Sequence, residues 1–367
     1  MASRSGMCVK DGIRKGLQKQ ARTTCMVEVD MGDEQSLDPV RRKPLTPGRL
    51  NQMRQGMVRI AFDEKPAISI NQKIRRGEFV FDVFAIHDDD PHTVKTIMGL
   101  KILTWNISYA HGNGSEGTPG WRRHPAVHYE NTLSAMATLI RNTGTDIALL
   151  QEVDFDSSRS FRRNQLDTLA RRSGLIHRSH CTSWDLPWVP YPGWNPLNHF
   201  GRIRSGGGIL SRFPIKSLQN DLLPKPRENP EWYNRLYLHR YFQMVETGGL
   251  RIVNLHLEAF SQENRKLHLL RLDERIRDFT PDLCGGDFNG SIDVHEDLSH
   301  EFEAIPSPGP TYPTPEPHER LDGFILKKSR FKPLRVEVPD TGTFSDHFPV
   351  LIEIDESSKN RPISPRV

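Results

Sequence analysis

The pattern of apolar and polar positions changes near residue 100. Upstream, apolar residues form only short patches without a sustained period, whereas downstream they recur in regular segments. Residues 101–105 and 146–151 are short apolar runs typical of buried strands. Leu133, Met136 and Ile140 recur at the spacing of an amphipathic helix. The downstream part therefore predicts strands separated by helices.

Two more helices are predicted in this part of the chain. One carries Leu166 and Leu169 and stops at Gly174, and the other begins at Ser261, a residue suited to capping. Several predicted strands follow each other without a helix between them, so the pattern favours an α/β fold with mixed sheets over a pure βαβ series. The further strands are expected at residues 206–211, 237–246, 250–257, 282–284, 321–326 and 348–354.

Two segments rich in aromatic residues and proline, 181–206 and 221–235, are predicted to be long loops. They hold four of the six tryptophans. Such rings could stack on bases, enter a membrane interface or pack the loops onto the domain. A glycine-rich stretch, 112–120, lacks the spacing of a phosphate-binding loop and is interpreted as a flexible rim.

The chain is expected to divide into three regions. Residues 1–97 are interpreted as a poorly structured N-terminal extension, because charge runs interrupt their apolar patches. Met98 begins a segment that resembles a natural protein start, and residues 98–356 are expected to form one large folded domain. Residues 357–367 are expected to be a C-terminal tail.

Charge and cysteine content narrow the classes of protein. Residues 1–97 hold 17 Lys and Arg against 13 Asp and Glu, and the remaining residues hold 33 of each kind. A dedicated DNA-binding protein usually concentrates positive charge on its working domain, so this balance is mild evidence against one, although a local basic stripe stays open. The four cysteines show neither metal-ligand spacing nor a disulfide framework. Without a signal peptide or a transmembrane segment, a cytoplasmic location is expected, and no feature indicates an obligate protein partner.

Polar residues stand at the ends of the apolar segments. After residues 282–284, Gly285 and Gly286 precede Asp287 and Asn289. Residues two apart at a strand end point to the same side, so the acid and the amide are predicted to face one spot. Strand ends gathered at one sheet edge form a crevice in which ligands commonly bind. The other polar residues in such places are Asn106, Glu152, His256, Asp322, Asp346 and His347.

Singly, each of these residues has a structural explanation, as a turn former, a solvated strand end or a core histidine. Together they suit phosphoryl transfer to water. Carboxylates such as Glu152 would hold Mg²⁺, which screens an anionic ester and stabilises the leaving oxygen. Amides and a histidinium can donate to the oxygens on which charge builds. A histidine held by a carboxylate, here His347 with Asp322, is suited to acid–base chemistry near neutral pH.

Six motifs carry these residues in order: Trp105-Asn106, Gln151-Glu152-Val153, Asn254-Leu255-His256-Leu257, Gly286-Asp287-Phe288-Asn289, Arg320-Leu321-Asp322 and Ser345-Asp346-His347-Phe348-Pro349-Val350. They resemble the motifs of the endonuclease/exonuclease/phosphatase superfamily. That superfamily includes deoxyribonuclease I, abasic-site endonucleases, deadenylases, inositol polyphosphate 5-phosphatases and neutral sphingomyelinases. The resemblance covers residues 100–355 and is specific for the superfamily, but it does not identify a substrate.

The resemblance implies a four-layer α/β sandwich of two facing mixed β-sheets flanked by helices. It identifies residues 98–356 as a catalytic domain that hydrolyses phosphoesters with Mg²⁺, for which Mn²⁺ could substitute. By motif position, Glu152 resembles the principal metal ligand, Asp346 a second acid of the metal site, and Asn106 the amide beside metal and substrate.

The remaining motif residues resemble the groups that act on water and phosphate. Asp287 and Asn289 resemble the pair that orients or activates the water and binds the phosphate. His347 resembles the active-site histidine, oriented by Asp322, and His256 a second histidine in contact with the phosphate. Abasic-site endonucleases carry an acid two residues after the first asparagine, where this chain has Ser108, which weakens that assignment.

Three functions are therefore compared. The first is a metal-dependent phosphodiesterase or phosphatase, whose phosphate ester could be a small molecule or a lipid. The second is a nuclease that acts on DNA or RNA. The third is a binding module that keeps only the fold, and the complete set of acids and histidines argues against it.

Overall fold

The computed structural model describes residues 99–112, 124–192 and 199–356, together with the backbone of three earlier strands. The chain divides into two compact units, Met1–Thr96 and Ile97–Val367. In the first unit, the strands pair in the antiparallel order β1–β2–β3. The other residues of the range 1–97, the stretch 113–123 and the tail 357–367 lie outside the described residues, so the expectations for them stay predictions. The three strands are β1 (Val58–Ile60), β2 (Ala67–Arg75) and β3 (Glu78–Ile86).

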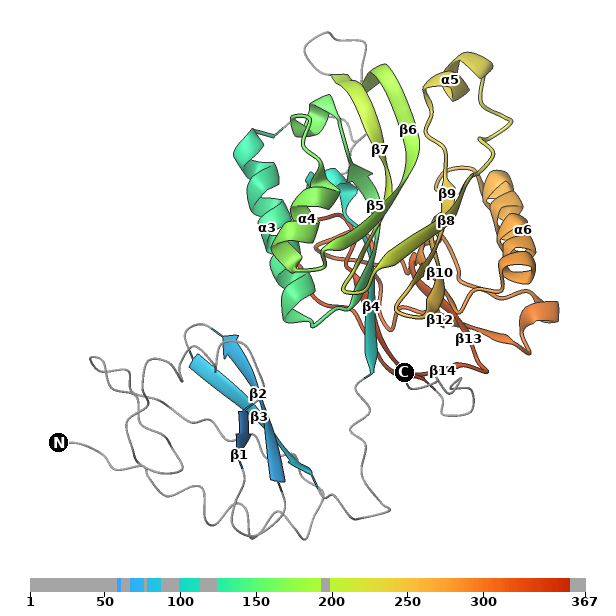
Figure 1. The fold of residues 1–367 in the computed structure, drawn as a ribbon. Coiled ribbons are helices and arrows are strands. Elements are labelled where there is room, and N and C mark those ends of the chain that lie inside the picture. The colour runs from blue at the N-terminus through green and yellow to red at the C-terminus, as the bar shows by residue number, and fades with distance from the viewer. Residues whose placement is uncertain are drawn as a thin grey trace. The chain divides into compact units, whose positions relative to one another are not determined.

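The second unit contains two six-stranded mixed sheets, as predicted. Figure 1 shows helices α3 and α4 on one side of the pair of sheets and α6 on the other, which gives the four-layer sandwich. The first sheet has the order β14 (Phe331–Glu337), β15 (Val350–Glu356), β4 (Leu100–Asn106), β5 (Ile147–Asp154), β7 (His199–Ser211) and β6 (His177–Pro192). The second has the order β12 (Phe302–Pro306), β13 (Asp322–Lys327), β11 (Leu283–Asp287), β10 (Leu250–His256), β9 (Tyr241–Thr247) and β8 (Ile215–Leu222).

The predicted helices form, and their ends follow local chemistry. The side chain of Asn164 accepts the backbone N–H of Asp167 at the start of α4, and Gly174 ends that helix in the left-handed conformation. Ser261 caps α6 by accepting the backbone N–H of Asn264, as predicted. None of the helices in the described ranges is long and apolar enough to cross a bilayer. The helices are α3 (Ala126–Asn142), α4 (Gln165–Ser173), α5 (Glu231–Leu236) and α6 (Gln262–Phe279), with 3₁₀ turns η1 (Ser108–Ala110), η2 (Ser158–Ser160) and η3 (Glu296–Leu298).

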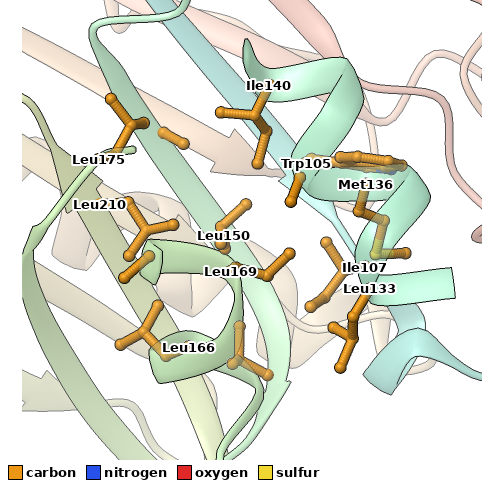
Figure 2. Packing of buried hydrophobic residues seen from close by; sticks show 14 of the residues in the cluster. Trp105, Ile107, Leu133, Met136, Ile140, Leu150, Leu166, Leu169, Leu175 and Leu210 are labelled. Atoms are coloured by element: carbon orange, nitrogen blue, oxygen red, sulfur yellow. The ribbon is translucent and has the colours of Figure 1, made fainter. Parts of the chain in front are cut away.

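Each boundary between layers is an apolar core. Figure 2 shows Leu133 and Met136 of α3 near Trp105 of β4 in the core outside the first sheet. A second core, with Leu149 and Phe324, lies between the sheets, and a third packs α6 on the second sheet. Burying such side chains contributes about 1.5–3 kcal/mol each.

A buried polar network also joins the two sheets. The Gln151 amide donates to Asn254 Oδ1 at 2.7 Å, and the Asn254 amide donates to Gln243 Oε1 at 3.1 Å. The Gln243 amide in turn donates to Ser179 Oγ at 3.2 Å. Gln151 and Ser179 belong to the first sheet, whereas Asn254 and Gln243 belong to the second. Because buried amides need partners, the network restricts how the sheets can slide against each other.

The predicted long aromatic loop at 181–206 was wrong, and the one at 221–235 is correct only for residues 223–230. Most of residues 181–206 form the hairpin β6–β7, and Trp184, Val189, Phe200 and Ile203 make a small core within it. Pro187 and Pro190 are compatible with β6 because it is an edge strand whose pairing is interrupted by bulges. The segment 221–235 contains most of helix α5. Strands β8 and β14 were missed because few of their positions are buried, and β12 was missed because its two buried residues, Phe302 and Ile305, are three apart and do not alternate.

A chain that begins at Met98 is predicted to fold and to keep the thermal stability of the full chain. The reason is that contacts concentrate within the unit Ile97–Val367, which holds both six-stranded sheets. The melting temperature and circular dichroism of the two proteins test this. A shortened chain that is insoluble or melts much lower would show that residues 1–97 pack on the domain.

Candidate active site

Strand register places three of the predicted site residues side by side. His256, at the end of β10, pairs with Asp287, at the end of the parallel strand β11. Asp287 pairs in turn with Asp322, the first residue of the antiparallel strand β13. The sequence therefore sets one histidine and two acids at a single edge of the second sheet. The first sheet supplies Asn106 from β4 and Glu152 from β5.

The carboxylate of Asp287 is the point at which these residues meet. Its Oδ2 accepts the Asn106 amide at 3.0 Å and lies 3.4 Å from His256 Nε2 and 3.8 Å from His347 Nε2. The side chain is 1% exposed. Burial raises the pKa of Asp287 to about 6, although the His347 cation acts in the opposite direction. A carboxylate that loses and regains a proton near neutral pH is suited to act as a base.

His347 and Asp322 form the predicted pair. His347 Nδ1 donates to Asp322 Oδ2 at 2.8 Å, and the Thr311 hydroxyl donates to the same oxygen at 2.7 Å. The Tyr312 ring lies 4.8 Å from the His347 ring. Burial alone would lower the pKa of His347, but the carboxylates of Asp322 and Asp287 outweigh burial and raise it to about 10. The imidazole is therefore a cation at neutral pH, fixed in orientation.

Asp287 and Asn289 are joined by a turn rather than by strand alternation, so the geometric argument from the sequence was wrong. β11 ends at Asp287, and Asn289 has a φ of 51°. The Asn289 backbone N–H donates to Asp287 Oδ1 at 2.9 Å, and its side-chain amide donates to the Leu257 carbonyl at 2.9 Å. Gly286 is required nearby for space, because a Cβ there would lie 2.0 Å from the Leu255 carbonyl oxygen.

Glu152 is aimed by a β-bulge. The pairing of β5 with β7 shifts between Leu150 and Val153, and Glu152 itself has a φ of 55°, in the left-handed region. Its side chain is 22% exposed, and its Oε1 lies 3.9 Å from His256 Nε2. Burial raises the pKa of Glu152, while the cations of Arg240 and His347 oppose this effect. The bulge thus directs the carboxylate into the space between the sheets.

Asp346 completes the group of buried acids. Burial raises its pKa to about 6, the His347 cation lowers it, and the charge of Glu152 raises it further. Ser108, at the position where abasic-site endonucleases carry an acid, provides a hydrogen bond to Asp346 instead. The carboxylates of Asp346 and Glu152, which repel each other, are a fitting site for a hard divalent cation.

A second grouping could also hold a metal ion. Within the part of the chain that the structure describes, Asp287, Asp322 and His347 offer ligand atoms that all lie within 4.8 Å of one another. The hydrogen bond between His347 and Asp322 already uses one atom of each side chain. We therefore assign these residues to acid–base chemistry and the predicted metal set Glu152, Asp346 and Asn106 to the cation.

Arg240 is a site residue that the sequence pattern did not identify. It precedes β9 and is 5% exposed. Its Nη1 contacts His256 Nε2 and lies 3.2 Å from His256 Nδ1. Burial and the Arg240 cation both lower the pKa of His256 well below 6.5. The sequence offers no clear signal for Arg240, because the segment 237–246 already contains polar residues and the partner, His256, lies on the next strand of a hairpin.

Two facing mixed sheets that hold a His–Asp pair and a group of buried acids at one edge define the deoxyribonuclease I-like class of α/β sandwich. Residues 103–347 match the Endonuclease/Exonuclease/phosphatase family, and the chain belongs to that family. The resemblance inferred from the motifs is thereby confirmed. No curated protein matches the chain at a significant level.

Solved structures with the same fold include an endonuclease/exonuclease/phosphatase from Beutenbergia cavernae. It is 21% identical, has a TM-score of 0.53, and the match covers 73% of each chain. A humanized D. rerio TDP2 is 13% identical, with a TM-score of 0.44, over 70% of this chain and 99% of that one. A mannosyl-6-phosphatase from Bacteroides thetaiotaomicron is 16% identical, with a TM-score of 0.44, over 70% and 99%.

The charged state of His347 predicts a pH-dependent stability in EDTA. The folded chain holds a proton on His347 up to about pH 10, whereas an ordinary histidine releases it near 6.5. This stabilisation is complete below pH 6.5 and is lost as pH rises through about 10. Asp287 and Asp346 have pKa values raised from 3.8 to about 6, so each makes the free energy of unfolding fall as the pH rises from 3.8 to about 6.

Between pH 6.5 and 10, the unfolding free energy of the wild type should therefore decrease by about 2–4 kcal/mol more than that of His347→Gln. The reason is that one pKa unit corresponds to about 1.4 kcal/mol. Urea unfolding at several pH values measures it. The matched control is His318→Gln, because that side chain is 70% exposed. Equal pH profiles for the wild type and His347→Gln would refute a charged, buried imidazole.

Proposed function

We propose that the chain is a divalent-metal-dependent phosphoester hydrolase. One observation carries the proposal: a single buried oxygen, Asp287 Oδ2, faces an asparagine amide and two histidines, one of which is held by a second acid. A binding module has no need for a base with a pKa near 6 beside a fixed imidazolium. Membership of the family supports hydrolysis as the reaction class.

In the proposed reaction, water attacks phosphorus, a proton passes from the water to Asp287, and the bond from phosphorus to the leaving oxygen breaks. Asn289 fixes Asp287 through its backbone N–H. The His347 cation donates a hydrogen bond to a non-bridging oxygen, because Asp322 aims the ring. Arg240 and His256, which contact each other beside Asp287 Oδ2, can bind a second oxygen.

Glu152 and Asp346, with Asn106 beside them, would hold Mg²⁺ or, in its place, Mn²⁺. The bound cation would screen the anionic ester and stabilise the leaving oxygen. The residues present fit this role because Glu152 interacts with both Asp346 and Asn106, and because all three side chains are largely buried and offer oxygen ligands. The two carboxylates would also lose their mutual repulsion on binding.

The substrate is proposed to be a phosphate ester, either a small or lipid-like molecule or, in the nuclease alternative, DNA or RNA. The active-site acids and histidines are common to both. The two buried thiols, Cys181 and Cys284, suit the cytoplasm that we propose as the location. A screen with Mg²⁺ of bis-p-nitrophenyl phosphate, single-stranded DNA, RNA and sphingomyelin would separate the alternatives.

Activity is expected to require a divalent cation and to vanish in EDTA, because Glu152 and Asp346 otherwise repel each other. Glu152→Gln keeps the shape of the side chain but removes its charge. The variant should need about tenfold or more Mg²⁺ for half-maximal turnover, since charge sets cation affinity. Glu274→Gln on the exposed surface of α6 is the control. Undiminished turnover in excess EDTA would exclude the metal.

His347→Ala and Asp322→Asn should each lower kcat by about 10²–10³-fold, the usual effect of losing one fixed donor to the oxygen on which charge builds, because Asp322 aims the His347 ring. The double variant should lose little more kcat than the less active of the two single variants, because the two side chains act as one unit. His256→Ala should add to these losses more nearly in full, because the ring lies on another strand and has its own partner, Arg240.

Thermal stability is measured on the same preparations, which separates catalytic from packing roles. If both histidines only pack the core, the variants will melt at lower temperature while the folded protein keeps its kcat. A His347→Ala protein of full kcat would remove that residue from the mechanism.

A further inference from the structure

A row of aromatic rings leads away from the active site along helix α5. The Tyr237 and Tyr233 rings are stacked, with centroids 5.6 Å apart. The Trp232 ring meets Tyr233 edge-on at 5.8 Å. Exposure increases outward, since Tyr237 is half-buried while Tyr233 is 39% and Trp232 60% exposed. The row thus runs from the interior to solvent.

The inner end of the row is attached to the catalytic machinery. Tyr237 donates its hydroxyl to Glu258 Oε1 at 2.7 Å, and Glu258 stands two residues after His256. The same oxygen accepts the Phe260 backbone N–H at 3.1 Å, and the Phe260 side chain is 83% exposed. The Arg240 cation interacts with Tyr237 and Glu258. A substrate whose phosphate reaches Arg240 would therefore extend past these rings.

Packing of the domain does not account for the outer rings. Trp184, on the neighbouring hairpin, is 9% exposed and donates its indole N–H to the Leu236 carbonyl, so it fixes α5 to the hairpin. Trp232 leaves most of its surface in water instead. Large exposed rings beside a functional site commonly mark a binding surface.

The polar character of helix α5 favours a nucleobase over a lipid. Residues 223–240 carry four Lys and Arg against two Glu, which suits a phosphate-bearing ligand of either kind. Within α5, Glu231, Asn234 and Arg235 share a six-residue helix with the rings. An element that enters a bilayer interface needs a broad apolar face, which this helix lacks. Aromatic rings combined with cations are the usual means of holding single-stranded nucleic acid.

We propose that Trp232 and Tyr233, with Phe260 on the adjoining loop, form a subsite that stacks the base of a nucleotidyl phosphoester. The phosphate of that nucleotide lies at Arg240 and His256. The subsite rests on the proposed phosphoester hydrolysis and identifies its substrate class as esters that carry an unpaired base. It acts on binding of the non-leaving group and leaves the chemical step unchanged.

Two esters with the same leaving group test the subsite. In p-nitrophenyl thymidine 5′-phosphate the phosphate carries a nucleoside, and in methyl p-nitrophenyl phosphate it carries a methyl group. Trp232→Ala should lower kcat/KM for the thymidine ester by about 5–100-fold, the usual effect of losing one base–aromatic stack, and should leave the methyl ester unaffected. Trp232→Phe should retain most of the preference for the thymidine ester over the methyl ester. Leu270→Ala, which removes an exposed side chain from α6, is the matched control.

An unchanged ratio of the two esters in Trp232→Ala would overturn the subsite while leaving hydrolysis intact. Vesicles of phosphatidylcholine and phosphatidylserine provide a second test. If the wild type sediments with them, Trp232→Ala does not, and the ratio of kcat/KM for the two esters is the same in both proteins, the rings bind lipid and the subsite is rejected. If the wild type cleaves neither of these diesters, hydrolysis of phosphodiesters fails as the proposed function, and binding of a thymidine oligonucleotide then decides on the subsite. Weaker binding by Trp232→Ala, of about 5–100-fold, supports the subsite, and equal binding rejects it.

Discussion

The arrangement of the site depends on the burial of one carboxylate, Asp287. A buried charge is tolerated only when hydrogen bonds and opposite charge compensate the loss of water. Asn106 and the Asn289 backbone donate to it directly, and the His347 cation lies 3.8 Å away. These partners come from three separate segments, β4, the turn after β11 and the loop before β15, so the acid can be buried only if the two sheets and that loop meet correctly. Folding and assembly of the site are therefore one event.

The polar network behind the site keeps the sheets in that relation. Gln151 and Asn254 hydrogen-bond across the gap between the sheets. Gln151 directly precedes Glu152 in the sequence, and Asn254 stands two residues before His256. An apolar interface alone would tolerate small shifts, because hydrophobic contact has little directional preference. Directional bonds between amides restrict the two sheet edges to one relation, and catalysis requires that the reacting groups be held close to the productive geometry.

Much of the site could be predicted because its residues follow apolar strands, and strand ends converge at a sheet edge. The positions of His256, Asp287 and Asp322 at such ends follow from that pattern, whereas Glu152 lies inside β5, which continues to Asp154 beyond the predicted end, and is aimed by a bulge. Arg240 could not be found in this way, since its contact with His256 depends on hairpin register. The hairpin β6–β7 was mistaken for a loop because its prolines and bulges hide the alternation of an edge strand.

The backbone at Glu152 carries a further consequence for how this chain can change. A left-handed φ of 55° is unfavourable for a glutamate, and a glycine or asparagine would adopt it more easily. Selection for stability alone would therefore tend to remove the acid, and only selection for activity would retain it. A descendant that lost its catalytic role should gain stability first at this bulge, so the residue there records whether a lineage still uses the site.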